Sequence, residues 1–174
     1  MASLVGNSNL VTKVYFPREI LPFSAVLVAF VDTVVAATVL VALMAWYGIW
    51  PGAAVLVLPV IVLAQLAFTL GMALLLAMAN LFYRDVKYLF EVAITVWMFA
   101  TSVVYPIERV GGQLGTLLMI NPMTHVIDAY RAVLLHGVVP PVTTLAPLLA
   151  VCLATFAGSW MLFHIAEFRF AENI

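Results

Sequence analysis

Two long stretches of the chain contain no charged side chain. Lys, Arg, Asp and Glu are missing from residues 33–83 and again from residues 132–166. Each stretch exceeds the ~20 apolar residues that cross the hydrocarbon core of a bilayer as a helix. Over the whole chain of 174 residues, 66% are hydrophobic and 9% are charged, against roughly 25% charged in soluble domains. A soluble domain cannot bury so much apolar surface, so the sequence predicts an all-α polytopic membrane protein.

The composition also excludes several classes of function. A net charge of −1 offers no basic surface for a nucleic-acid partner. The single cysteine, Cys152, cannot build a disulfide framework or a cysteine metal site. The sequence has no GxxxxGK[ST] phosphate-binding loop, so we expect no ATP hydrolysis by this chain. We predict no catalytic residue, metal site or cofactor.

Four segments are predicted to span the membrane as helices. They cover residues 23–46, 53–79, 88–105 and 145–166. The glycines and proline of residues 48–52 predict a tight turn between the first two spans. A short charged link, residues 80–87, separates the second span from the third.

The distribution of Lys and Arg predicts the orientation of these spans. Four spans place both termini and the 80–87 link on one side of the membrane, and cytoplasmic segments are enriched in Lys and Arg. That side carries Lys13, Arg18, Arg84, Lys87 and Arg169, and the other carries Arg109 and Arg131. We therefore expect a protein of the inner (cytoplasmic) membrane with both termini in the cytoplasm.

Residues 106–141 are too charged and too broken to span, yet too apolar for a free loop. Asn121 followed by Pro122 is typical of a helix N-terminus, and Gly137 is placed to end that helix. At ~1.5 Å per residue this helix is roughly 22 Å long, shorter than a ~30 Å hydrocarbon core. With a shorter helix over residues 113–120, it predicts a pair of re-entrant helices at the outer face.

Residues 9–22 form a short amphipathic segment that precedes the first span. Apolar side chains recur at helical spacing, and Pro17 and Pro22 are expected to end the segment. A helix lying on the cytoplasmic surface is one interpretation. A docking element for a cytoplasmic partner is the other.

Several motifs resemble those of one known family. The segment NLVTKVYFPREILP, residues 9–22, is similar to the cytoplasmic coupling segment of ABC-2 type exporter permeases, in the group that exports O-antigen, capsular polysaccharide or teichoic acid. Further motifs resemble other parts of that group: NLFYRDV (80–86), YP (105–106), NPMT (121–124), YR (130–131) and FRFAENI (168–174). Members of the group have an interfacial helix and two spans before the coupling segment, so the chain resembles the C-terminal two-thirds of a permease.

The resemblance implies an organisation and a set of partners. It implies one ABC-2 type transmembrane domain over residues 1–174, with a coupling segment at 9–22 and an external re-entrant region at 106–141. It also implies a second permease copy, a separate ABC ATPase subunit and an undecaprenyl-linked glycan as the exported substrate. The residues expected to couple to the ATPase are Lys13, Tyr15, Phe16, Arg18, Arg84 and Asp85. For Arg84, a simple anchoring role at the cytoplasmic surface is the alternative.

Two other functions stay open at this point. An inactive or regulatory membrane fragment of such a permease is the main alternative. A polytopic membrane enzyme is less favoured, because its chemistry would need clustered acidic, histidine or basic side chains. The acidic residues of this sequence are instead scattered singly.

Five residues are candidates for a transport pathway: Asp32, Trp97, Tyr105, Asp128 and Arg131. Asp32 lies near the middle of a span, where a charge costs at least ~2.5 kcal/mol and must face protein or water. A structural hydrogen bond inside the helical bundle is its alternative role. Asp128 and Arg131 share a helix face with His125, where polar pairing is favoured over hydration of an exit path. The two aromatic residues could stack on sugars, although aromatics in membrane helices more often pack or anchor.

One stripe of small residues predicts where helices pack. Ala150, Ala154 and Gly158 recur every four residues in the last span, a pattern typical of close helix–helix contact in membranes.

Overall fold

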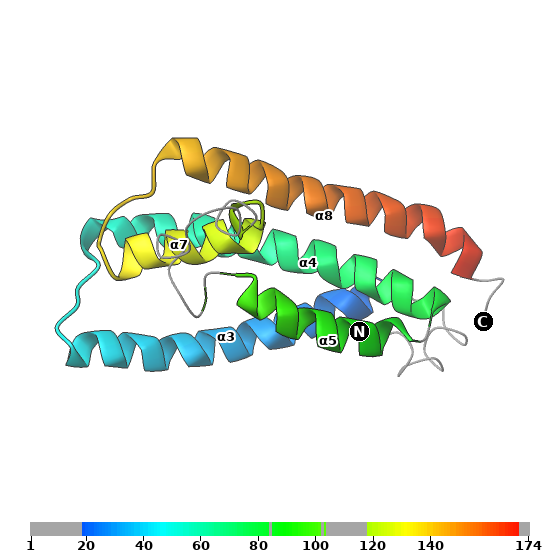
Figure 1. The fold of residues 1–174 in the computed structure, drawn as a ribbon, viewed down its shortest axis with the longest axis horizontal. Helices are drawn as coiled ribbons and strands as arrows, with labels where there is room; N and C mark the ends of the chain where they lie inside the picture. The colour runs from blue at the N-terminus through cyan, green and yellow to red at the C-terminus, as the bar shows by residue number, and fades with distance from the viewer. Residues whose placement is uncertain (1–18, 84, 102, 104–117, 171–174) are drawn as a thin grey trace.

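The computed structural model of the protein describes residues 19–83, 85–101, 103 and 118–170, which form a bundle of helices (Figure 1). The elements are α3 (Ile20–Trp46), the 3-10 helix η1 (Gly52–Val57), α4 (Leu58–Phe82), α5 (Val86–Phe99), α7 (Pro122–Leu134) and α8 (Val142–Phe170). These described ranges contain helices and no strand. The all-α prediction is therefore confirmed.

Three helices in the described ranges are long and apolar enough to cross a membrane. They cover Ile20–Trp46, Gly52–Asn80 and Val142–Ile165. The third helix is shorter than the span predicted over residues 88–105, because α5 has 14 residues and ends at Phe99. A helix of that length is about 21 Å long, less than the ~30 Å hydrocarbon core.

The shortened third helix, α5, is continued by α7, the helix that the sequence predicts after Asn121. Along the long axis of the molecule, α5 and α7 occupy successive stretches and run in the same direction (Figure 1). Together they carry the chain from one end of the bundle towards the other. As a result, the start of α3 and the end of α8 lie towards the same end (Figure 1).

Helix boundaries also differ from the predicted ones near prolines and charges. The first long helix begins at Ile20 and holds Pro22 in its first turn, where a missing N–H is tolerated because these N–H groups have no intrahelical partner. The predicted charged link over residues 80–87 is shorter, since α4 continues to Phe82 and α5 begins at Val86.

The closest contact in the bundle joins α4 to α8. A Cβ atom added at Gly71 of α4 would lie 3.0 Å from the Cα and N atoms of Phe156 in α8. The two backbones therefore touch at this level. On both sides of the contact, buried side chains fill the interface, including Ile61, Ala64 and Leu74 of α4 with Cys152 and Phe163 of α8.

The face of α8 that makes this contact is not the one predicted from small residues. Ala150, Ala154 and Gly158 are all exposed, and no atom lies within 4 Å of a Cβ added at Gly158. The packed face instead presents Cys152, Ser159 and Phe163, each at most 2% exposed. The prediction that the stripe packs against a neighbouring helix of this chain is therefore wrong.

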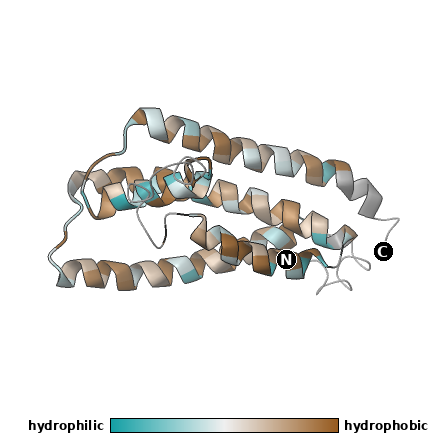
Figure 2. Ribbon diagram, viewed as in Figure 1, coloured by the Kyte–Doolittle hydropathy of each residue, from teal (hydrophilic) through white to brown (hydrophobic). Residues whose placement is uncertain are grey.

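Two helices present apolar surface outward. Between Val26 and Met44, every side chain of α3 is exposed except the half-buried Phe30, and α5 has no buried side chain. Both helices are apolar around most of their circumference (Figure 2). Such helices face lipid or another protein surface rather than water.

The close approach of α4 and α8 predicts the effect of substituting two glycines. Gly71→Val would push a side chain into the backbone of Phe156, and overpacking of this kind destabilises by about 1–3 kcal/mol. Gly158→Val is the matched control, because its side chain would meet open space. We expect thermal unfolding of the purified protein in detergent to show a lower Tm for Gly71→Val alone. An equal Tm for the two variants would contradict the packing described here.

Candidate functional site

Helix α7 lies in the bundle because one of its faces is apolar and buried. Val126 and Val133 are 1% and 0% exposed, and Ala129 between them is 6% exposed. They form one core cluster with side chains of η1, α4 and α8, including Ile61, Leu148 and Cys152. The helix predicted to lie at the membrane face is thus built into the core.

The predicted ends of α7 are confirmed. The Asn121 side-chain oxygen accepts a hydrogen bond of 3.0 Å from the backbone N–H of Met123, and Pro122 occupies the first helical position. The helix ends at Leu134, and Gly137 follows with a φ of +64°. Gly137 also lies against Pro51, since an added Cβ would meet the Pro51 carbonyl oxygen at 3.4 Å.

The amide group of Asn121 has a second function, which ties α7 to the end of α5. Its Nδ2 donates to the carbonyl oxygen of Ala100 at 3.0 Å and to Oγ1 of Thr101 at 3.1 Å. Thr101 is 2% exposed, and its hydroxyl donates to the carbonyl oxygen of Trp97 at 2.7 Å. The last turn of α5 and the first turn of α7 therefore share one hydrogen-bonded network.

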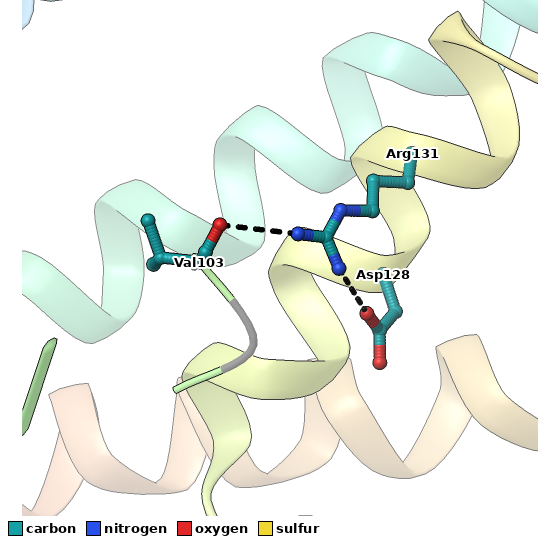
Figure 3. A network of polar contacts seen from close by, with 3 residues as sticks. All are labelled: Val103, Asp128 and Arg131. Carbon is teal, nitrogen blue, oxygen red and sulfur yellow. Dashed lines mark hydrogen bonds and ion pairs between the residues drawn. The ribbon is translucent and has the colours of Figure 1, made fainter. Parts of the chain in front are cut away.

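A second tie comes from the last turn of α7 (Figure 3). Nη2 of Arg131 donates to the carbonyl oxygen of Val103 at 3.2 Å, and Nη1 lies 3.5 Å from Oδ1 of Asp128. The predicted pairing of Asp128 with Arg131 is thus present. His125, the third residue of that face, has a different partner, because its Nε2 lies 2.7 Å from the Met119 carbonyl oxygen.

A half-buried polar contact links α7 to the first third of α4. The hydroxyl of Tyr130 donates to Oε1 of Gln65 at 2.7 Å. Beside this contact lies a cavity of about 80 Å³ between α3, α4 and α7, whose polar lining includes Thr33, Gln65, Thr69 and Tyr130. The sequence marks Gln65 as an unusual polar residue in an uncharged span, but not its partner.

Two candidate pathway residues lie on outward surfaces. Asp32 is exposed in the middle of α3, and Trp97 is 42% exposed on α5. Among the described residues, Asp32 makes no ion pair with Arg131 and no hydrogen bond to another helix of the bundle. Because a carboxylate at this depth must face protein or water, the exposed side of α3 is not a purely lipid-facing surface.

Most of the predicted coupling residues lie outside the described part of the chain. This holds for Lys13, Tyr15, Phe16, Arg18 and Arg84, and also for the pathway candidate Tyr105. Asp85 is described and lies exposed between α4 and α5. Its carbonyl oxygen accepts from the N–H groups of Tyr88 and Leu89 at 3.1 and 3.2 Å, and so begins α5.

The dual role of Asn121 can be separated by one substitution. Asn121→Asp keeps an oxygen that accepts from Met123 but removes the amide donor to Ala100 and Thr101. A buried carbonyl that loses its donor is destabilised by about 1–3 kcal/mol, so we expect faster hydrogen exchange in the last turn of α5 with little change in α7. Asn121→Ala, which also removes the cap, should speed exchange in both helices. Wild-type exchange of α5 in both variants would contradict the tie.

Comparison with known proteins places the chain in a family. The ABC-2 type transporter family matches residues 4–135. An O-antigen export system permease protein, RfbA, of Myxococcus xanthus is 33% identical over 175 residues, which cover 99% of this chain and 67% of that protein. A permease protein of the same name from Klebsiella pneumoniae is 25% identical over 171 residues, covering 98% of this chain and 66% of that protein. The chain thus spans about two thirds of the length of these relatives, and it belongs to the ABC-2 type transporter family.

Proposed function

We propose that the chain is the membrane permease part of an ABC transporter that exports a lipid-linked polysaccharide of the O-antigen, capsule or teichoic acid class. The observation that carries this proposal is the match to O-antigen export permeases along 99% and 98% of the chain. Since the chain spans about two thirds of those proteins, the activity is proposed for the complete permease.

The broken crossing made by α5 and α7 supports a transport function. Non-helical backbone at membrane depth is tolerated only where protein or a water-filled path surrounds it. Here the break carries polar side chains that face one another, namely Asn121, Thr101, Asp128 and Arg131.

The proposed partners follow from the family and from the exposed faces. A separate ABC ATPase subunit would bind Lys13, Tyr15, Phe16, Arg18, Arg84 and Asp85 on the cytoplasmic side of the inner membrane. A second permease copy would cover part of the apolar surface of α3 and α5. An undecaprenyl-linked glycan would pass along a path that includes Asp32, Trp97, Tyr105, Asp128 and Arg131.

An inactive or regulatory membrane fragment is the second candidate function. Complementation separates the two functions. In a strain without the permease gene, we expect the complete frame of the permease to restore surface polysaccharide. The 174 residues alone are expressed in the same strain for comparison. Unrestored surface polysaccharide with the complete frame would overturn the exporter.

The first prediction of the exporter function concerns binding of the ATPase subunit to the coupling segment. In the complete permease, Tyr15→Ala with Phe16→Ala should weaken binding of the ATPase subunit by about 2 kcal/mol, roughly 30-fold, if these aromatics fill a cleft in it. Co-purification of the ATPase is measured beside the membrane abundance of the permease. Undiminished co-purification would identify the segment as a surface anchor.

The proposed orientation gives the second prediction. Asp85→Cys places a thiol between α4 and α5, and Trp50→Cys places one in the exposed turn after α3. A membrane-impermeant thiol reagent should label position 85 from the cytoplasm and position 50 from outside. The native Cys152 is 0% exposed and adds little background. Labelling from the opposite sides would reverse the topology.

A further inference from the structure

The start of α3 is joined to the last third of α8 by a contact between a carboxylate and a histidine ring. Glu19, the residue before α3, lies with Oε1 3.1 Å from Nδ1 of His164 in α8. An N–H at that ring nitrogen donates to the carboxylate both in imidazolium and in the matching neutral tautomer. The Glu19 side chain is 19% exposed and that of His164 is 53% exposed, so the carboxylate is partly shielded while the imidazole ring stays open on one side.

Aromatic rings hold the histidine in position for this contact. The rings of His164 and Trp160 are stacked, with centroids 5.8 Å apart and an angle of 11° between their planes. Phe23 of α3 packs edge-on against Trp160 at 5.7 Å and against Phe156 at 6.4 Å. One ring of α3 thus packs against two rings of α8, and His164 stacks on one of those two.

The same region is anchored in the core of the bundle. Phe163, Leu74 and Ala77 are at most 2% exposed and form a cluster against which Leu21 and Phe23 pack. We call the joint made by Glu19, Phe23, Trp160 and His164 the α3–α8 clasp. It lies on the α4–α8 pair, close to where α4 and α8 approach each other at Gly71.

The clasp joins α3 to α8 through side chains, while α3 contacts α4 more extensively than it contacts α8. Beyond Val26, the helix is exposed until Met44, apart from the half-buried Phe30. A displacement of the backbone just before Glu19 can therefore reach α8 through the clasp. The rest of α3 transmits less of this displacement, because its side chains between Val26 and Met44 are mostly exposed.

We propose that Glu19 and His164 are positioning residues that transmit motion of the coupling segment to α8. The proposal rests on the proposed function, in which an ATPase subunit binds Lys13, Tyr15, Phe16 and Arg18, in the segment that leads into Glu19 and α3. In this arrangement α8 and α4 move together with the start of α3 when the ATPase changes conformation. Because Glu19 and His164 act through their contact with each other, their loss should uncouple transport from hydrolysis.

The test compares transport with hydrolysis in the complete permease–ATPase complex, reconstituted in lipid vesicles. Glu19→Gln and His164→Ala should leave ATPase binding and ATP hydrolysis near wild-type levels while lowering glycan transported per ATP by roughly fivefold or more, the lower range of coupling between distinct sites. The double variant should be no worse than either single variant, because both remove the same contact. His164→Gln, which keeps an N–H donor, should recover part of the transport.

His136→Ala serves as the matched control, because this exposed histidine follows α7 at the other end of the bundle. It should transport as the wild type does. Unchanged glycan transport per ATP in Glu19→Gln and His164→Ala, or transport and hydrolysis that fall together, would overturn the clasp while leaving the exporter intact. A wild-type complex that transports no glycan on ATP hydrolysis would overturn the exporter, and the clasp with it.

Discussion

The contact between α4 and α8 is the constraint on which the rest of the bundle depends. Lipid tails are as apolar as leucine, so helices in a membrane associate by close packing rather than by hydrophobic burial. Gly71 allows the backbone of α4 to reach that of α8 at Phe156. Two core clusters extend from this pair, one with α7 and η1 packed on it and the other with the start of α3. Every well-buried region of the described chain thus includes α4 and α8.

The elements differ in how they attach to this pair, and the difference has a functional meaning. Helix α7 is buried along one face, and α3 is held at Pro22, Val26 and Met44. Most of α3 and the whole of α5 remain open. An exposed carboxylate at Asp32 cannot be left against lipid at that depth. The open faces are therefore the surfaces at which a second copy, further spans or a hydrated path would meet this chain.

Local signals in the sequence predicted more than the long-range contacts did. The absence of charges located the long helices, and Asn121, Pro122 and Gly137 located α7, because capping and turn chemistry depends on neighbouring residues. The third span was predicted too long, since hydropathy does not reveal that Asn121 binds the Ala100 carbonyl. Likewise, Ala150, Ala154 and Gly158 show that one face of α8 carries small side chains. Which face of α8 packs on α4 depends on the side chains of α4, which the pattern in α8 does not reveal. The contact of Gln65 with Tyr130 needs the tertiary fold.

The end of α5 shows why a helix can stop inside such a bundle. The last carbonyl groups of a helix have no intrahelical donor, and each unsatisfied group in a hydrocarbon environment is destabilising by several kcal/mol. The hydroxyl of Thr101 donates to Trp97 in the last turn. Asn121 supplies a donor to the C-cap carbonyl of Ala100, and Arg131 supplies one to Val103 just beyond the helix. Both come from α7, whose opposite face is fixed in the core by Val126 and Val133. The break in the crossing and the burial of α7 are therefore one structural solution, because the donors that permit the break are held in place by that burial.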